Sequence, residues 1–389
     1  MIQFPKDLEE HLLAYVKREF YRGTRRAAFA ERPFIEEDLR FFSKGVSELS
    51  DLFTSERAEL RAGYLNRPEL RAAYLLYFLP INFAKGLDVL GRLPEEFWRR
   101  DSYRVIDLGC GPGSVSLAFA QLLLERNPKA KVEFTLVEQN PAILQDAQNL
   151  LRFRMPQAEI KAVKAWLHAF HFAGEYDLIL MSHVLNELVK LGAQERAEWL
   201  MPNLQRHMAK QGLVAILEPA LKRPTRELMA LRDHLLESGN FTVLAPCLHD
   251  QRCPMLAATL QDWCHFYVDW KEPEYLQKLD KMVKNDNRFV KVAYLILAHP
   301  QAFASNRREK LYRVVSNRMA TRGKTEAVLC GEGGRMTLTR LDKERTEANR
   351  GIDDIRRGDL VEIADYRGKG FEVTRQIRAD KKFSIKKVL

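Results

Sequence analysis

A glycine-rich segment between an apolar run and an amphipathic stretch constrains this chain more than any other feature. The apolar run ends in Asp107, and the amphipathic stretch covers residues 115–124. Between them, glycines follow the acid at every second position: Gly109, Gly111 and Gly113. This order predicts a strand, a tight turn and a helix. Because glycine has no Cβ, such a turn can lie directly against a ligand, beside the unpaired N–H groups that open the helix.

The spacing of the acid and the glycines separates two ligand classes that use this geometry. A dinucleotide site carries Gly-x-Gly-x-x-Gly, whereas this chain reads Asp-x-Gly-x-Gly-x-Gly. A carboxylate beside the loop would repel a pyrophosphate, but it suits a cation such as the amino-acid part of S-adenosylmethionine (SAM). The next predicted strand ends in Glu138, and this acid can accept both ribose hydroxyls. These residues resemble the first motif and the following acidic position of class I methyltransferases; an ordinary strand–helix turn is the alternative.

The alternation of apolar runs and amphipathic stretches predicts an α/β protein with a doubly wound, Rossmann-like sheet. Strands are expected at 103–107, 132–137, 159–163, 177–181 and 212–217, and helices near Ser114, Pro141, Leu188 and Arg223. Four regions are expected: a helical region at 1–100 with an interruption at Pro80, a SAM-binding domain at 101–245, a cysteine-rich and then helical segment at 246–304, and a basic β-rich region at 305–389.

Charge is unevenly distributed along the chain, whose formal net charge is +10. The region from Ser305 to Leu389 holds 22 Lys and Arg against 13 Asp and Glu, an excess of nine. Such a region is typical of contact with a phosphate backbone, and a solvated surface is the alternative. The run from Arg18 to Arg26 interleaves basic and aromatic residues, which can grip RNA by charge and stacking; a solvated helix end explains it nearly as well.

Composition also bears on the location of the protein. No apolar run reaches the roughly 18–20 residues needed to span a bilayer. The first residues are acidic and lack the layout of a signal or transit peptide. We therefore expect a monomeric protein of a bacterial cytoplasm, without a membrane partner.

Two further strand ends supply candidate site residues, because the carboxyl ends of the strands in such a sheet face the ligand cleft. After the third predicted strand, Trp166 stands where many class I enzymes have an acid; its indole could stack on adenine or lie in the core. After the fourth come the candidate catalytic residues, His183, Asn186 and Glu187. His183 could be a general base, while the other two could equally cap the next helix. The usual acceptor-reading motif Asn-Pro-Pro-Tyr is missing, so methyl transfer stays open.

Of the five cysteines, Cys110 lies in the glycine loop and is expected to be a packing residue. The other four are Cys247, Cys253, Cys264 and Cys330. Cytosolic cysteines clustered among His and Pro residues indicate metal ligation rather than disulfides. Four thiolates fit either a [4Fe–4S] cluster or a structural zinc, and His249 or His265 could replace Cys330 in a zinc site. Reduced thiols that bind nothing are the remaining alternative.

Together these motifs resemble one known family, the mitochondrial small-ribosomal-subunit-associated, methyltransferase-like proteins and their bacterial relatives. The matching stretches are 73–80, 107–113, 182–188, 246–254, 263–266 and 329–330. The resemblance implies a class I methyltransferase domain that binds SAM and a [4Fe–4S] cluster held by four cysteines. Carried to this chain, those cysteines are Cys247, Cys253, Cys264 and Cys330. It also implies association with the rRNA and proteins of the small ribosomal subunit during assembly or translation.

Three functions are compatible with these observations. The first is an RNA-binding assembly factor for the small ribosomal subunit, in which SAM mainly stabilises or gates the fold. The second is an active SAM-dependent rRNA methyltransferase with the same binding face. The third is a methyltransferase for a protein or a small molecule, with zinc as a structural staple.

Overall fold

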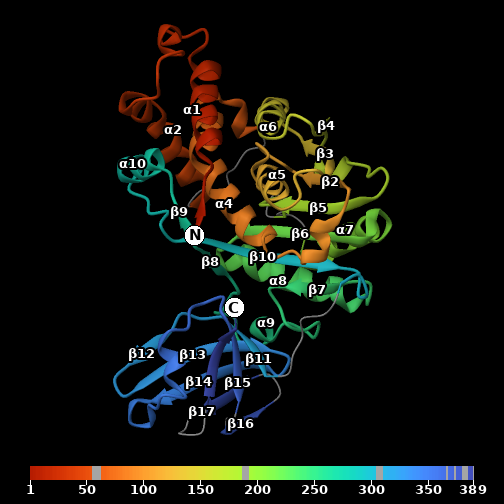
Figure 1. Ribbon diagram of the computed structural model, residues 1–389, viewed down its shortest axis with the longest axis vertical. Coiled ribbons are helices and arrows are strands. Elements are labelled where there is room, and N and C mark those ends of the chain that lie inside the picture. Colours follow the sequence, from red (N-terminus) through yellow and green to blue (C-terminus); the bar gives the residue numbers. More distant parts are fainter. Residues whose placement is uncertain are drawn as a thin grey trace. The chain divides into compact units, whose positions relative to one another are not determined.

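The chain divides into two compact units in the computed structural model. The first unit is Met1–Ser182 with Val268–Val290, and the second is His183–Tyr267 with Lys291–Leu389. The structure describes residues 1–54, 63–185, 192–303, 310–364, 367–371, 374–378 and 384–388. Figure 1 labels the helices and strands along the chain. The four-part division expected from the sequence stays a prediction.

The first unit contains a parallel sheet in the order β4-β3-β2-β5. Its strands are β2 (Ser102–Leu108), β3 (Lys131–Glu138), β4 (Glu159–Lys164) and β5 (Tyr176–Ser182). The four strands predicted over this part of the sequence are confirmed. The central strands are continuously apolar at Val105, Ile106, Leu136 and Val137, as expected for parallel strands that are buried on both faces.

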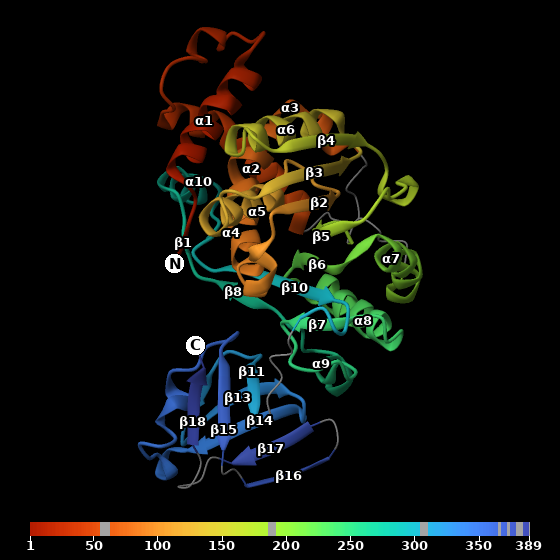
Figure 2. The ribbon, with the colours of Figure 1, turned by 45° about the vertical axis from the view of Figure 1, so that its right-hand side comes forward.

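Helices cover this sheet and form the N-terminal region. They are α1 (Lys6–Tyr21), α2 (Glu36–Thr54), α3 (Pro68–Ala73), α4 (Leu79–Leu90), α5 (Ser114–Arg126) and α6 (Pro141–Arg154). Figure 2 shows α4 beside α5. Gly86 permits this contact, because a Cβ there would lie 2.8 Å from the Cβ of Ala118. The interruption expected at Pro80 lies just upstream of it, as a π-helical turn at Tyr74–Phe78. Pro80 itself lies in the first turn of α4, where a backbone N–H makes no hydrogen bond within the helix.

A segment from late in the sequence completes the first unit. Strand β9 (Trp270–Lys271) pairs in parallel with β1 (Ile2–Gln3), and α10 (Glu274–Val283) packs against α2. The Tyr77 hydroxyl donates a buried hydrogen bond to the Asp280 carboxylate. The Tyr275 hydroxyl donates to the Leu76 carbonyl at 2.9 Å. Residues from distant parts of the sequence therefore share one core.

The second unit contains a set of strands in the order β6-β10-β7, with β8 also paired to β10. These strands are β6 (Met208–Pro219), β7 (Thr242–Ala245), β8 (Phe266–Val268) and β10 (Val290–Ala298), and β10 is antiparallel to both β6 and β7. The helices are α7 (Ala193–His207), α8 (Lys222–Glu237) and α9 (Pro254–Ala258). Helix α7 begins at Ala193, where Glu195 accepts the Gly192 N–H, rather than near Leu188, which lies outside the described residues.

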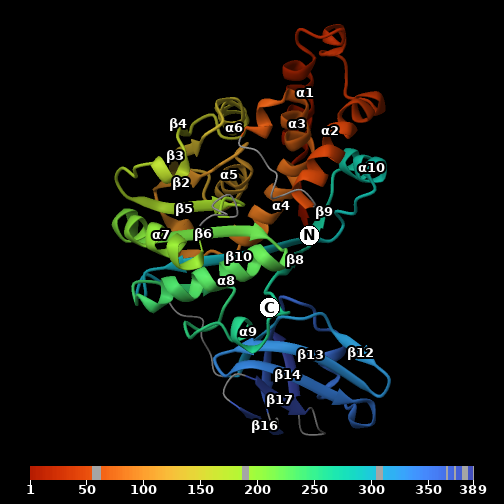
Figure 3. The ribbon, with the colours of Figure 1, turned by 180° about the vertical axis from the view of Figure 1, so that it is seen from behind.

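A second sheet, drawn in blue in Figure 3, runs in the order β16-β17-β14-β13-β11-β15-β18, with β12 paired to β13. Its strands are β11 (Leu311–Val314), β12 (Met319–Thr321), β13 (Lys324–Gly331), β14 (Gly334–Leu341), β15 (Leu360–Ala364), β16 (Arg367–Phe371), β17 (Thr374–Arg378) and β18 (Ser384–Val388). Alternate residues, such as Met336 and Leu338 in β14, face an apolar core. Among the described residues, none of the helices combines the length and hydropathy needed to cross a bilayer.

Candidate functional site

The loop after β2 has the open, left-handed backbone that its glycines predict. Gly109, Gly111 and Gly113 have φ angles of 68°, 52° and 77°. A Cβ at Gly111 would meet no atom within 4 Å, so this part of the loop is open to a ligand. A Cβ at Gly113 would lie 3.2 Å from the Cβ of Ala147 in α6. Loop residue Gly109 donates its N–H to the Val137 carbonyl at 2.8 Å, which fixes the loop to β3.

Asp107, in β2 just before this loop, is a buried carboxylate that uses only part of its hydrogen-bonding capacity. Its side chain is 1% exposed. One carboxylate oxygen accepts the Ser116 hydroxyl at 2.7 Å, and the other is buried with no hydrogen-bond partner among the described residues. Burial raises the pKa of Asp107 to about 7, although the Ser116 hydroxyl opposes the shift. A cation placed here would supply the missing partner and favour the ionised carboxylate.

Glu138 closes the other side of the loop at the end of β3. Its two carboxylate oxygens accept the N–H groups of Gly111 at 3.2 Å and Asn140 at 2.9 Å. Burial raises the pKa of Glu138, and these N–H groups oppose the shift. A carboxylate has about four lone-pair sites, so Glu138 keeps capacity for two ligand hydroxyls. The Asn140 side chain in turn caps α6 by accepting the N–H groups of Ala142 and Ile143.

Trp166 lies at the surface beside this acid. The preceding residue, Ala165, donates its N–H to the Glu138 carbonyl at 3.2 Å. The indole is 52% exposed, so the alternative that places it in the core is wrong. Stacking of the indole on adenine stays a prediction.

Of the candidate catalytic residues, only His183 lies within the described part of the chain; Asn186 and Glu187 are outside it. His183 directly follows β5 and has a φ of 60°, a conformation that L-residues other than glycine seldom adopt. Sequence reasoning missed Glu218, which is 1% exposed and accepts the Leu185 N–H at 3.0 Å. It is an acid after an apolar run, as Asp107 and Glu138 are, and that pattern was the available signal.

The structure brings the four predicted ligand cysteines together within the second unit. Cys330 comes from β13, much later in the sequence than the other three. Cys253, Cys264 and Cys330 pack against one apolar cluster that includes Met229. Burial raises the pKa of the Cys330 thiol well above its usual range, and the nearby sulfurs raise it further: those of Cys247, Cys253 and Cys264. Whether these sulfurs hold a metal stays a prediction.

Burial favours the protonated thiols of Cys253, Cys264 and Cys330 in the unliganded chain. It raises the pKa of Cys253 to about 12 and shifts the pKa of Cys264 upward as well, with the neighbouring cysteines adding to both shifts. Within the described ranges, no three His, Cys, Asp or Glu side chains are arranged to hold a single metal ion. Of the two histidines considered as zinc ligands, His249 has its Nε2 3.8 Å from the Cys330 sulfur. The pKa of His265 is lowered to about 4, mainly by burial.

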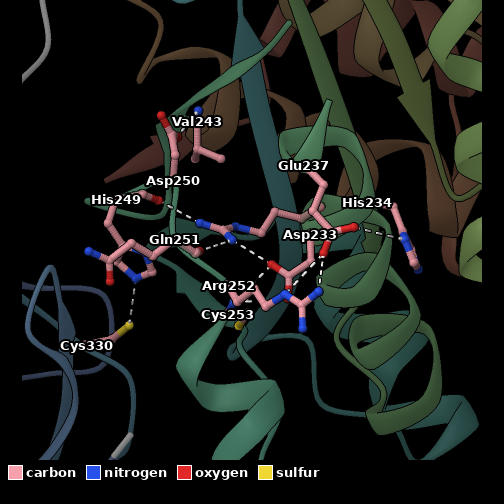
Figure 4. Close-up of polar contacts among 11 residues, drawn as sticks. Asp233, His234, Glu237, Val243, His249, Asp250, Gln251, Arg252, Cys253 and Cys330 are labelled. Carbon is pink, nitrogen blue, oxygen red and sulfur yellow. Dashed lines mark hydrogen bonds and ion pairs between the residues drawn. The ribbon is translucent and has the colours of Figure 1, made fainter. Parts of the chain in front are cut away.

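Buried arginines hold the backbone of the cysteine-bearing segment, which Figure 4 shows from His249 to Cys253. Arg232 of α8 donates to the carbonyls of His249, at 2.6 Å, and Gln251. Next to it, Asp233 accepts the Cys253 N–H with both oxygens, each at 3.0 Å. These contacts fix the path of the chain and place positive charge beside the sulfurs.

From β11, Arg313 donates to the Pro246 carbonyl at 2.7 Å. Arg226 donates to the carbonyls of Thr259 and Asp262, both at 2.8 Å. Arginines from separate elements thus hold the segment on both sides of Cys253.

The aromatic residues of the run from Arg18 to Arg26 do not lie where RNA stacking would need them. Phe20 and Tyr21 are buried, and the Tyr21 hydroxyl donates to Asp38 at 2.6 Å. The expectation that these two rings grip RNA is therefore wrong, because the apolar face of α1 turns them into the core. Of the basic residues of the run, Arg26 pairs with Glu37 at 3.4 Å, whereas Arg18, Arg22 and Arg25 are exposed.

The chain is similar to several known proteins. Over 143 residues the chain is 34% identical to trans-aconitate 2-methyltransferase from Azoarcus sp. (strain BH72), a match covering 36% of this chain and about half (48%) of that enzyme. The chain is also similar to a putative class I S-adenosylmethionine-dependent methyltransferase from Listeria monocytogenes (12% identity, TM-score 0.40, covering 76% of this chain and 88% of that one). Another similar structure is magnesium protoporphyrin IX methyltransferase from Synechocystis PCC 6803 with bound SAH (12% identity, TM-score 0.36, covering 66% and 99%).

One family model matches residues 68–377, which is most of the chain. The matched range contains the glycine loop, His183 and the four clustered cysteines. The family expected from the motifs is thereby confirmed. The chain belongs to the family described as mitochondrial small ribosomal subunit Rsm22.

Proposed function

We propose that this protein binds SAM in its first unit, carries an iron–sulfur cluster in its second unit, and contacts rRNA of the small ribosomal subunit. Its family membership supports the ribosomal link, and its methyltransferase relative supports a methyltransferase-like domain. The observation that carries the SAM assignment is the buried oxygen of Asp107, which has no partner among the described residues.

The residues around the glycine loop fit SAM at four points. Asp107 offers a desolvated carboxylate to the cationic amino-acid part. Gly111 leaves room for a ligand against the backbone, and Glu138 retains acceptor capacity for the ribose hydroxyls. The exposed indole of Trp166 supplies a surface on which adenine would stack. When bound, SAM supplies a methyl group on a positively charged sulfur.

SAM binding to Asp107→Asn tests this assignment. The amide retains the shape of the carboxylate but lacks the charge, so we expect SAM affinity to fall by about 10- to 100-fold, the loss of one buried charge-assisted contact. Asp101→Asn is the matched control, because Asp101 is exposed near the opposite end of β2. Isothermal titration gives both affinities. Equal affinities in the two variants would contradict the assignment.

The four clustered cysteines fit a [4Fe–4S] cluster better than a single ion. The sulfurs are near enough to raise the pKa of the Cys330 thiol, but no three of the described His, Cys, Asp or Glu side chains are arranged to hold a single metal ion. A cluster is larger than one ion, so it can bind thiolates that do not surround a single metal ion. Buried Arg232 and Arg313 lie against the same segment and offset the negative charge of thiolates. We propose Cys247, Cys253, Cys264 and Cys330 as the ligands, with structural zinc as the alternative outcome.

Iron and sulfide analysis of anaerobically purified protein tests the cluster. We expect a brown protein with broad absorbance near ~400 nm, as is typical of such clusters. Cys253→Ser should lose the iron, whereas Cys110→Ser should keep it, because Cys110 lies in the glycine loop of the other unit. A colourless preparation that contains zinc would replace the cluster with a zinc site.

The basic C-terminal region is proposed to supply part of the rRNA contact. Its excess of nine positive charges favours a phosphate backbone, and exposed Arg322 lies on the turn between β12 and β13. Binding to small-subunit rRNA should weaken steeply with salt, in proportion to the number of phosphates contacted. Co-sedimentation with small ribosomal subunits at increasing salt measures this. Binding that does not weaken with increasing salt concentration, or no binding at low salt, would exclude RNA contact from the proposed function.

The left-handed conformation of His183 favours methyl transfer as a second candidate function. Strained residues concentrate at functional sites, and this one directly follows strand β5. His183→Asn keeps a residue that tolerates positive φ, and His183→Gly removes the strain altogether. If the imidazole acts as a base, both variants should lose methylation of rRNA while binding SAM normally. Retained methylation in both would leave His183 without a catalytic role.

A further inference from the structure

A cationic hollow in the N-terminal helices is used by none of the functions described so far. It has a volume of about 590 Å³ and lies between α1, the loop after α1, and α6. Its lining includes Arg18, Arg22 and Arg152. We propose that this hollow binds a phosphate of single-stranded RNA, with the neighbouring base stacked at Phe153. This inference rests on the proposed function, because it names where the RNA is held.

The three arginines differ from the other arginines around them. Arg154 pairs with Asp7 at 2.7 Å, and Arg32 pairs with Asp38 at 3.3 Å. In contrast, the described residues form no ion pair or hydrogen bond with the side chains of the three arginines lining the hollow, and all three are exposed. Guanidinium groups bind phosphate through paired N–H donors, so a phosphate would take the place that carboxylates occupy elsewhere.

Buried bonds hold the two walls of the hollow in place. The Tyr15 hydroxyl of α1 donates to the Asp146 carboxylate of α6 at 2.5 Å. The same carboxylate pairs with Arg71 at 3.1 Å, and Asn149 donates to the Tyr15 hydroxyl at 3.3 Å. Arginines from α1 and α6 are thus presented from a fixed frame, which reduces the entropy lost when a ligand binds.

An aromatic ladder lies at the rim of the hollow. His11 lines the hollow and stacks on Phe153, with ring centroids 3.6 Å apart and planes 8° from parallel. On α1, Tyr15 continues the ladder at 6.3 Å from His11. Phe153 ends it and is 38% exposed. Burial lowers the pKa of His11, and Arg18 lowers it further, which favours the neutral ring in this stack.

The charge of the residues that line the hollow limits which ligands it can bind. Glu19 and Glu31 also line it, so the three arginines leave an excess of one positive charge. That balance disfavours tight capture of a free polyanion and suits one phosphate of a chain that is anchored elsewhere. An exposed ring beside the phosphate site selects a nucleotide over an acidic peptide, which has no base to stack.

The test measures binding of a short single-stranded oligouridylate to the full chain by fluorescence anisotropy at several salt concentrations. The triple variant Arg18→Gln, Arg22→Gln, Arg152→Gln should bind at least about tenfold more weakly, and its salt slope should fall by about 0.7, the value for one phosphate of a single strand. The matched control changes three exposed cations elsewhere in the unit: Arg99→Gln, Lys129→Gln and Lys131→Gln. The control should stay within about threefold of the unsubstituted chain if the hollow is specific.

A second pair of variants separates stacking from charge. Phe153→Leu keeps an apolar contact for His11 but removes the ring, so it should weaken RNA binding about tenfold without changing the salt slope. Phe153→Trp should bind as tightly as the unsubstituted chain or more tightly. Glu19→Gln with Glu31→Gln should tighten binding, because two repulsive charges are removed.

The outcomes distinguish this inference from the function on which it rests. If the unsubstituted chain binds RNA and the hollow variant binds it equally well, the inference fails and the proposed function stands. If the unsubstituted chain binds no RNA at all, both fail. Two further outcomes overturn the RNA assignment. In the first, uridine monophosphate displaces the oligonucleotide with an affinity equal to that of the oligonucleotide itself. In the second, the triple substitution abolishes binding of an acidic peptide but leaves binding of the oligonucleotide unchanged.

Discussion

The glycine-loop site and the cysteine site of this protein are built in opposite ways. The first lies within one strand–turn–helix segment and the strand that follows, from Asp107 to Glu138. The second joins the segment after β7 to β13, which lies much later in the sequence than Cys247. The first site is therefore fixed by local backbone geometry, whereas the second depends on the packing of a whole unit. This difference predicts which substitutions damage a site alone and which damage the fold around it.

The largest effect is expected at the cysteine site. Cys330→Ser should lose most of its iron and lower the unfolding temperature by roughly 10 °C, because metal binding is coupled to folding. Differential scanning calorimetry under anaerobic conditions measures the shift. Cys110→Ser, a buried cysteine of the other site, should unfold within about 3 °C of the unsubstituted chain. If the two variants unfold alike and keep equal iron, the contrast between the sites disappears.

The next effect is local and depends on pH. The pKa of Asp107 is about 7 in the folded chain, above the value of about 3.9 for an unfolded aspartate. The folded state therefore binds this proton more tightly, and without ligand this group lowers stability as pH rises between those two values. Because SAM binding favours the ionised form, the rise in unfolding temperature caused by SAM should grow from about pH 6 to about pH 8.

Asp107→Asn is the control for this pH dependence. In this variant, the stability of the unliganded chain and the rise in unfolding temperature caused by SAM should both depend less on pH, because the amide does not titrate. Thermal unfolding with and without SAM across the pH series measures them. A pH response that survives in the variant would assign the titration to another group.

A smaller effect is expected from the support of the cysteine segment. Asp233→Asn weakens the contact to the Cys253 N–H and the pair with Arg232. We expect a loss of about 2 kcal/mol in the free energy of unfolding and faster loss of iron to a chelator. Urea unfolding and iron release measure the two. Asp354→Asn, an exposed acid of the same unit, should change neither.

The smallest effect concerns the frame of the glycine-loop site. Asn140→Ala removes the cap of α6 and should cost about 1 kcal/mol, while Asn140→Ser should restore most of it. Urea unfolding gives both values. Because the same residue donates its N–H to Glu138 through the backbone, SAM affinity should change little. A large loss of SAM affinity in the alanine variant alone would show that the cap also positions the acid.

The glycine-loop site was accessible from sequence because its determinants are close together. Apolar runs that end in Asp107 and Glu138 predicted strands β2 and β3, and the glycine spacing predicted the turn between them. A lone tryptophan gives no such signal. The position of Trp166 depends on how β4 ends, and it lies at the surface rather than in the core.

The cysteine site and the cationic hollow were less accessible, because each depends on tertiary packing. The clustering of the cysteines among His and Pro residues predicted metal ligation but could not show that Cys330 returns to Cys253; β13 had to be placed first. Likewise, the basic run that begins at Arg18 was visible, but Arg152 joins it only because α1 packs on α6. The same packing buries Tyr21, which the sequence had offered as an RNA contact.

The late segment Val268–Val290 completes the first unit, so it determines when this unit can finish folding during synthesis. A ribosome must synthesise the chain through Val290 before this unit is complete. The N-terminal helices therefore lack part of their packing partner until most of the polypeptide has been made. An expression fragment that stops after Ser182 leaves the Tyr77 hydroxyl without its Asp280 acceptor and α2 without α10. Isolation of the first unit therefore calls for a chain in which this late segment is joined back to it.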